Sequence, residues 1–278
     1  MKKLLITAAA LFAIITLTTC QTLMAAFQEP SVSLHSVELG NISIDGAQII
    51  CKVQVENPNS FGIAFPETDW EFFINANSFL RGTIKNDQQI RSRDTSIVDV
   101  PLSINYLDLI NTFTSLRGSR ETAFKVALGV KFNLPIVGSK TWNFEHEGSL
   151  PMPQLPKFSA PTMSIASRDL TRAEIQVAIN VENPNVFPIP APKISYDYQV
   201  NRNSFIRGDA GGEGNLAANT TTPVVFRLIV TYADLLRSFA SLITAREVAS
   251  LLVMTCDFGI PLLGEPSRFE VSGTLPLR

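Results

Sequence analysis

Histidine, cysteine and charged side chains are scarce in this 278-residue chain, which has two histidines, three cysteines and 17% charged residues. His35 and His146 stand apart from any group of Cys, His, Asp or Glu with metal-ligand spacing. A nucleophile elbow, a P-loop and a dinucleotide-binding fingerprint are also missing from the sequence. We therefore expect no catalytic residue, no metal and no cofactor, and classify the chain as a non-enzyme.

An excess of positive charge and a long apolar segment are missing as well. The formal net charge is −2, so the sequence has no basic footprint for nucleic acid, and we expect no nucleic-acid partner. The apolar run near the N-terminus, Leu4–Leu17, is too short to span a bilayer comfortably. It follows Lys2 and Lys3, which is the arrangement of a secretory signal.

The end of this signal, Leu17-Thr18-Thr19-Cys20, resembles a bacterial lipobox, in which the cysteine becomes the acylated first residue of the mature protein. This resemblance predicts a lipoprotein-type signal over residues 1–20, lipidation of Cys20 and a short tether over residues 21–30. Thr19 departs from the usual small residue before the cysteine, and a plain secretory signal cut near Ala25 is the alternative. Gln21 follows in place of the aspartate that retains lipoproteins at the inner membrane. The expected location is therefore the outer membrane, facing the periplasm or the surface.

The two remaining cysteines, Cys51 and Cys256, are expected to be small buried hydrophobic residues. Each lies in an alternating strand pattern, and each matches a valine, Val177 or Val130, in the repeat described next. We expect no disulfide between them.

The most informative feature of the chain is an internal duplication at an offset of 126 positions. The run Val55-Glu56-Asn57-Pro58-Asn59 returns as Val181-Glu182-Asn183-Pro184-Asn185, and 181 minus 55 is 126. Three further blocks share this offset: Asn75–Gly82 with Asn201–Gly208, Tyr106–Leu109 with Tyr232–Leu235, and Phe132–Gly138 with Phe258–Gly264. The chain is therefore two copies of one domain of ordinary size.

Each copy is predicted to be an all-β domain with minor α content. Period-two alternation indicates seven strands in the first copy, at 32–39, 48–56, 70–76, 79–85, 96–104, 123–132 and 141–148, with seven counterparts in the second. Such a pattern predicts tandem antiparallel β-sandwiches of the immunoglobulin or fibronectin-III kind. Helical spacing over 106–116 and 232–242 adds one amphipathic helix to each, with Asn105 and Thr231 as N-caps.

A proline-rich segment separates the copies. We place the first domain at residues 31–151, a linker at 152–160 and the second domain at 161–278. Four prolines between Pro151 and Pro161 favour an extended, polyproline-like spacer that holds the domains apart semi-rigidly.

Two polar motifs recur in both copies and are the candidate site residues. The first is Asn-Pro-Asn, at Asn57, Pro58 and Asn59 and again at Asn183, Pro184 and Asn185. It is typical of a turn in which proline presets φ and asparagine bonds nearby backbone, although the asparagines could also form a polar binding rim. The second motif is arginine followed by glycine, at Arg81 and Arg207. Each arginine could contact an anionic group or pair with a carboxylate such as Glu56 or Glu182.

A strand that ends in Val-Glu-Asn-Pro-Asn, followed by phenylalanine and an Asn-to-Gly strand pair, resembles the late embryogenesis abundant group 2 domain, also called the water stress and hypersensitive response domain. The resemblance covers both copies. It implies a seven-stranded sandwich with one helix, a non-enzymatic role in desiccation and stress protection, and no catalytic residues to carry over.

Two functional hypotheses follow. The leading one is a membrane-tethered, non-catalytic binding or protective module of the cell envelope, whose partners are the membrane itself and an envelope protein or lipid. The alternative is a lipid carrier, suggested by 18 phenylalanines and by positive mean hydropathy. It requires an apolar cavity inside one or both sandwiches.

Overall fold

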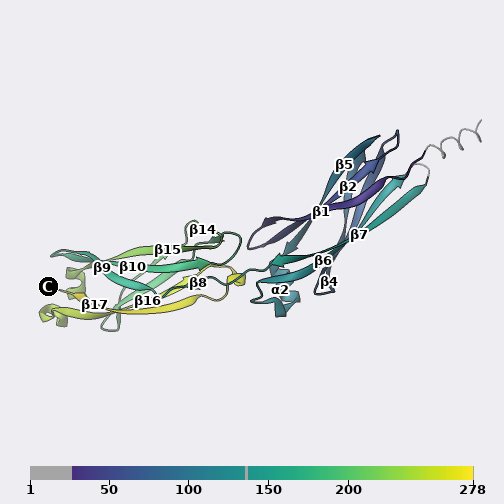
Figure 1. The fold of residues 1–278 in the computed structure, drawn as a ribbon. Coiled ribbons are helices and arrows are strands. Elements are labelled where there is room, and N and C mark those ends of the chain that lie inside the picture. The colour runs from purple at the N-terminus through teal and green to yellow at the C-terminus, as the bar shows by residue number, and fades with distance from the viewer. Residues whose placement is uncertain (1–26, 135–136, 278) are drawn as a thin grey trace, which may run out of the picture. The chain divides into compact units, whose positions relative to one another are not determined.

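The structure is a computed structural model that describes residues 27–134 and 137–277 of the chain (Figure 1). Contacts divide the chain into two compact units. The first unit holds strands β1 to β7, and the second holds the chain from Pro151 onward together with residues 42–46 and 106–120. The helix of the first sequence copy therefore groups with the second unit by its contacts.

The first unit consists of two antiparallel sheets. One has the order β1(Ser31–Ile42), β2(Gly46–Asn57), β5(Asp94–Asn105). The other has the order β4(Asn77–Ile90), β3(Ile63–Ile74), β6(Glu121–Leu134), β7(Gly138–Pro151). Alternate residues of β2, including Ile49, Cys51 and Val53, are fully buried, because successive side chains of a strand point to opposite faces.

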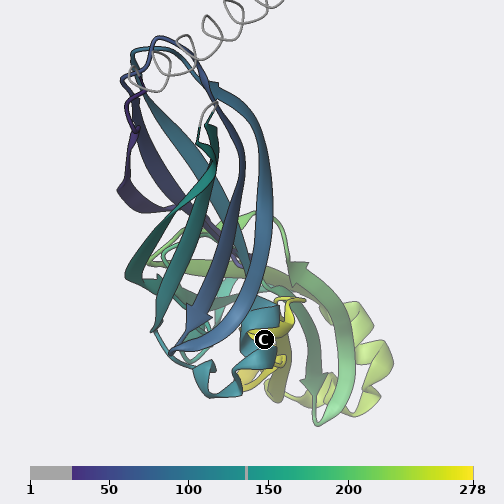
Figure 2. The ribbon, with the colours of Figure 1, turned by 90° about the vertical axis from the view of Figure 1, so that its right-hand side faces the viewer.

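The second unit repeats this plan. One sheet joins β15(Thr220–Thr231), β10(Arg172–Asn183), β9(Thr162–Arg168) and the short β8(Lys157–Phe158). The other has the order β13(Asn203–Gly211), β12(Lys193–Val200), β16(Glu247–Asp257), β17(Ser267–Pro276). A two-stranded ribbon pairs β11(Ile189–Pro190) with β14(Asn215–Leu216), and η3(Pro261–Leu263) joins β16 to β17. Figures 1 and 2 show the layered strands, and the predicted fold is confirmed, because each sequence copy forms a β-rich domain with one short helix.

The helical segments are shorter than their periodicity predicts. The α-helix α2(Tyr106–Thr112) is followed by a 3-10 turn, η1(Thr114–Leu116), and α3(Tyr232–Ser238) is followed by η2(Ala240–Thr244). Phe113 and Phe239 interrupt them with non-helical backbone, at φ −120° and −137°. The apolar spacing nevertheless identifies the buried face of the first helical segment. Four residues at this spacing are buried: Tyr106, Leu109, Ile110 and Leu116. Thr231 occupies the N-cap of α3 without a capping bond from its side chain.

Part of the proline-rich segment, which we expected to be an extended, semi-rigid spacer, pairs with a strand of the second unit. Lys157 and Phe158 form β8, which pairs with β10 opposite Glu182 and Val181. Met152 and Pro153 are buried, so the segment is built into the second unit.

The predicted signal, Cys20 and all of the tether except its last residues lie outside the described residues. Within the described part of the chain, none of the helices has the length and apolar character needed to cross a membrane.

Candidate functional site

In both copies the Asn-Pro-Asn motif forms a buried corner at the end of a long strand, β2 or β10. We call Asn57–Asn59 and Asn183–Asn185 the asparagine corners. The Asn57 side-chain amide donates hydrogen bonds to the carbonyl oxygens of Phe61, at 2.7 Å, and Arg91, at 2.9 Å. Its Oδ1 accepts from the backbone N–H of Asn59 and from Asn59 Nδ2, both at 3.1 Å. Asn57 thus closes its own turn and joins it to the segment around Arg91, 34 residues later.

The second corner repeats this arrangement. Asn183 Nδ2 donates to the carbonyl oxygens of Phe187, at 2.9 Å, and Ala217, at 3.1 Å. Its Oδ1 accepts from the backbone N–H and the side-chain amide of Asn185, at 3.0 and 2.9 Å. The first acceptor is a phenylalanine in both copies, and the second is Arg91 in one copy and Ala217 in the other. All four acceptors are backbone carbonyl oxygens, so the match does not depend on the accepting side chains.

The second asparagine of each corner holds the segment that leads into its domain. Asn59 accepts a hydrogen bond from the backbone N–H of Gln28, at 2.9 Å, and donates one to the Gln28 carbonyl, at 2.7 Å. Asn185 makes the same pair of bonds with the backbone of Gln154, at 2.7 and 3.0 Å. Gln28 and Gln154 are themselves 126 positions apart. Sequence reasoning missed both, although each lies 31 residues before its asparagine.

These hydrogen bonds distinguish between the two roles expected for the asparagines, a structural turn and a polar binding rim. Asn57, Asn59, Asn183 and Asn185 are at most 3% exposed. Their amide hydrogens and oxygens point to partners inside the corner, and a primary amide has two donor hydrogens and one acceptor oxygen to offer. The arrangement is that of a structural turn, and it leaves little hydrogen-bonding capacity for an external ligand.

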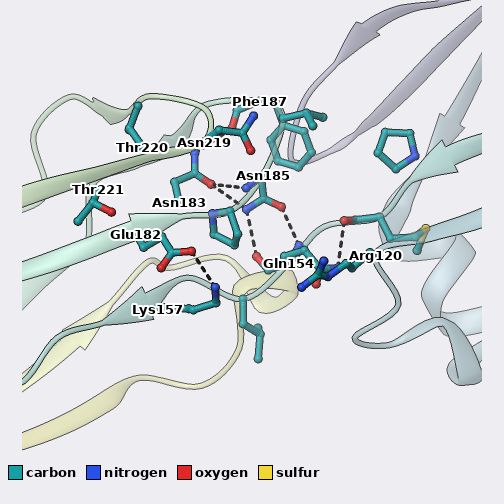
Figure 3. A pocket seen from close by; sticks show the side chains of 15 residues that line it. Arg120, Gln154, Lys157, Glu182, Asn183, Asn185, Phe187, Asn219, Thr220 and Thr221 are labelled. Atoms are coloured by element: carbon teal, nitrogen blue, oxygen red, sulfur yellow. Dashed lines mark hydrogen bonds and ion pairs between the residues drawn. The ribbon is translucent and has the colours of Figure 1, made fainter.

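An open cavity of about 530 Å³ lies beside the second corner, within the second unit (Figure 3). Lys157 and Glu182 form an ion pair at its wall, with 2.7 Å between Nζ and Oε1. Asn219 lines the cavity from the loop before β15, Thr220 from the start of β15, and Arg120 from the segment after η1. Apolar residues, among them Leu155 and Val186, line the cavity as well. None of the described residues that line it forms a hydrogen-bonded pair of a hydroxyl nucleophile and a base of the kind used in covalent catalysis.

The arginine of the second copy forms an ion pair within its own sheet. Arg207 lies opposite Asp197 in the β12–β13 register, with 3.5 Å between Nε and Oδ1. The expected partner Glu182 lies on the other sheet and pairs with Lys157, so that part of the prediction was wrong. Partial burial raises the pKa of Asp197, but hydrogen bonds from Ser204 and Gln199, together with Arg207, outweigh it and hold the pKa below its usual range.

Arg81 of the first copy occupies the equivalent place, opposite Glu71 in the β3–β4 register. The alternative partner Glu56 lies on β2, in the other sheet. Arg81 borders an open depression of about 640 Å³ on the outer face of the four-stranded sheet, together with Asp69, Glu71 and Glu145.

The glycine after each arginine makes room for an aromatic ring. A Cβ at Gly82 would come within 3.1 Å of the Trp70 ring, and a Cβ at Gly208 within 2.5 Å of the Tyr196 hydroxyl. The motif therefore combines an outward arginine with a residue over which a ring can lie.

The cysteines are small core residues. Cys51 and Cys256 are both free, and they are 0% and 1% exposed. Burial raises the pKa of the Cys51 thiol to about 12 and that of the Cys256 thiol to about 11. Such thiols carry almost no thiolate at neutral pH and are poor nucleophiles. Among the described residues, no group of three or more His, Cys, Asp or Glu could hold a metal ion.

Comparison with known proteins shows the family. The late embryogenesis abundant protein family, LEA_2, matches residues 52–148 and 178–273, which together make up more than half of the chain. The cotton (Gossypium hirsutum) late embryogenesis abundant protein Lea14-A is 27% identical over 132 residues, covering 48% of this chain and 87% of the cotton protein. The soybean (Glycine max) desiccation protectant protein Lea14 homolog is 24% identical over 127 residues, covering 46% and 84%.

A solved structure also matches over about one copy. The solution structure of an Arabidopsis thaliana protein is 24% identical, covers 47% of this chain and 86% of its own, and superimposes with a TM-score of 0.37. No enzymatic family is evident among these matches. With one match in each half, the chain belongs to the late embryogenesis abundant protein family, as two tandem domains of the LEA_2 type.

Proposed function

We propose that the protein is a non-enzymatic protective module that shields client proteins or membranes when water is lost. The observation that carries this proposal is the presence of two domains of a desiccation-related family in one chain. The buried asparagine corners agree with it, because the most distinctive polar residues of the chain are used to close the fold. Two linked copies also double the surface that meets a client, and linkage raises apparent affinity.

We further propose that the mature protein is tethered to a membrane of the cell envelope by acyl chains on Cys20. The lipobox-like sequence before Cys20 and the absence of aspartate at position 21 support anchoring in the outer membrane, on its periplasmic or surface side. A stable anchor requires more than one acyl chain, and a lipoprotein cysteine supplies such a group. The tether would hold the protective surface where drying damages a membrane first.

The protective role is tested by drying a labile enzyme, such as lactate dehydrogenase, with the full chain and measuring the activity recovered on rehydration. An equal mass of an immunoglobulin domain of unrelated sequence is the matched control, because it has similar architecture. We expect higher recovery with this protein. The same comparison is then made with dried phospholipid vesicles, with leakage on rehydration as the readout. Equal results for the two proteins in both assays would contradict the proposal.

The tether is tested separately by labelling bacteria that express the full precursor with radioactive palmitate. The wild-type chain should carry label in the membrane fraction, and Cys20→Ala should carry none. Unlabelled wild-type protein, cut near Ala25, would show that the signal is a plain secretory one.

A lipid carrier is the second candidate function, and one feature of the second unit bears on it. A cavity of about 230 Å³, with apolar and hydroxyl-bearing residues in its lining, lies between β9 and β17. This volume is smaller than the roughly 300–1,000 Å³ of sites that enclose a drug-sized ligand, so a whole phospholipid would not fit. Native mass spectrometry of gently extracted protein decides the matter, because a carrier must retain lipid beyond its covalent acyl chains.

A further inference from the structure

A small pocket in the second unit is lined by apolar residues and by four residues that carry hydroxyl groups, of which two, Tyr198 and Ser250, are buried. It opens between the edge strands β9 and β17, which contact each other, and has a volume of about 230 Å³. Met163, Ile175 and Leu275 supply apolar walls, while Tyr198 and Ser250 supply the buried hydroxyls. Tyr198 and Ser250 are 0% and 6% exposed. We call these five residues the hydroxyl pocket.

The Tyr198 hydroxyl is the unusual member of this pocket. It is buried, and within the described part of the chain it makes no hydrogen bond of acceptable geometry. Burial raises the pKa of Tyr198, and the Ser250 hydroxyl lowers it in part. Ser250 is therefore close enough to act on the phenol, although the two hydroxyls do not form a hydrogen bond of good geometry. Buried polar groups almost always have a hydrogen-bond partner. An unpartnered Tyr198 hydroxyl beside a cavity therefore points to a partner that would occupy the cavity.

The first copy shows what a closed version of this pocket looks like. The positions of Tyr198 and Ser250 are held there by Phe72 and Phe124, each 126 residues earlier, and their rings stack with centroids 5.3 Å apart. The Phe124 ring lies over Gly148, with Cζ only 2.7 Å from where a Cβ would be. Phenylalanine therefore fills in the first copy the space that Ser250 leaves open in the second.

The glycine that faces this space is present in both copies. Gly273 pairs with Ser250 across β16 and β17, and Met163 Cε lies 2.4 Å from where a Cβ at Gly273 would be. Tyr198 lies opposite Leu252 on the same sheet, so its ring is a diagonal neighbour of Ser250. Met163 fills only part of the space above Gly273 and Ser250, and the remaining space is the cavity of the hydroxyl pocket.

From this geometry we infer that the second domain binds a small neutral amphiphile in the hydroxyl pocket, with an apolar body against Met163 and Ile175 and an oxygen that accepts a hydrogen bond from Tyr198. The size follows from the volume, since a cavity of about 150 Å³ already accommodates benzene. Neutrality follows from the lining, in which none of the residues that form the pocket is charged. Phenols and short alcohols fit both requirements.

This site does not depend on the protective role proposed above, and it is tested on the full chain with methionine methyl groups labelled with carbon-13. Phenol is the probe, and toluene is the matched control that has the ring without the oxygen. We expect phenol to shift the Met163 methyl signal saturably and to bind about tenfold more tightly than toluene, as one buried hydrogen bond allows. Met152 and Met254, which are buried outside the pocket, should not move.

Two variants taken from the first copy complete the test. Tyr198→Phe should remove the preference for phenol over toluene, and Ser250→Phe should fill the pocket and remove binding of both. An unchanged Met254 signal shows that each variant is folded. The inference is overturned if phenol gives no saturable shift in the wild type, if toluene binds the wild type as tightly as phenol, or if a folded Ser250→Phe variant binds phenol normally.

Discussion

The two copies share their backbone joints and differ in their cores. Asn57 and Asn183 make equivalent hydrogen bonds to equivalent loops. The core position that holds Phe124 in the first copy, in contrast, holds Ser250 in the second, and this change opens a pocket. The asparagine corners that close each sandwich are thus the same in the two copies. The core packing differs, and the second copy contains a cavity where the first has a phenylalanine ring.

The outer faces show a third behaviour, in which the interaction is kept while the residues exchange roles. In the first copy the Thr83 hydroxyl donates to the carboxylate of Asp69, at 2.5 Å. In the second copy Ser195 donates to Asp209, at 2.7 Å, so the carboxylate has moved to the other strand. Cross-strand pairs of this kind stabilise a sheet from either side.

The largest expected effect concerns the core difference. Phe124→Ala should lower the free energy of unfolding of the first copy by about 3–5 kcal/mol, because it removes a buried ring and leaves a cavity. Ser250→Ala should cost less than about 1 kcal/mol, because the space around Ser250 is already open. Native-state hydrogen exchange of β6 and β16 measures the two effects separately. Equal costs at the two positions would show that the cores are packed alike.

The next effect concerns the asparagine corners. Asn57→Ala and Asn183→Ala should each cost about 2–3 kcal/mol, because several backbone groups lose their partners inside the corner. The two costs should agree within about 0.5 kcal/mol if the corners are equivalent. Urea unfolding followed by exchange in β2 and β10 supplies both numbers. A cost below about 0.5 kcal/mol would place the asparagines among ordinary surface residues.

A smaller effect is expected at the glycines beside the arginines. Gly208→Ala should destabilise the second domain by about 1–3 kcal/mol, because the Tyr196 ring must move to admit the new methyl group. Gly82→Ala should cost less than Gly208→Ala, since the Trp70 ring, 3.1 Å from the new methyl group, has to move only a few tenths of an ångström and alanine restricts the unfolded chain. Thermal unfolding of the two variants gives the comparison. The reverse order would contradict the ring positions.

The smallest effect is expected from the exposed ion pair. Arg207→Ala should cost less than about 1 kcal/mol, because the arginine side chain is 73% exposed. The pKa of Asp197 is lowered on folding, so its contribution is present above the unfolded value of about 3.9 and is lost as pH falls through the folded value. The variant should therefore differ from wild type at pH 7 and converge with it in acid. Carboxyl carbon-13 titration should show the pKa of Asp197 rising in the variant, and an unchanged pKa would contradict this.

The strand pattern and the duplication could be predicted because they depend on side-chain alternation, which a sequence displays directly. The strand expected from Trp70 begins at Ile63 instead. A register shift between Phe65 and Glu67, around Pro66, breaks the alternation and hides the first part of β3. Proline at an irregularity of this kind is compatible with a strand, but it removes the periodic signal.

The parts of the site that escaped prediction depend on backbone groups or on register. Gln28 and Gln154 bind the corners through their backbone N–H and carbonyl groups, so their side chains leave no signature. The partner of Arg207 follows from the β12–β13 register, which alternation alone does not determine. The pocket at Tyr198 could be recognised only from the three-dimensional neighbours of Tyr198 and from the comparison with the first copy, where the equivalent space is filled.

The central claim is that the recurring asparagines close two equivalent sandwiches and do not form a ligand-binding rim. Hydrogen exchange of the side-chain amides of Asn57, Asn59, Asn183 and Asn185, followed by nitrogen-15 NMR on the full chain, tests it most directly. We predict slow exchange at all four residues, with similar protection in the two copies, because each asparagine is at most 3% exposed and its amide donates hydrogen bonds within the protein. Exchange as fast as that of a solvated asparagine in either copy would contradict the claim.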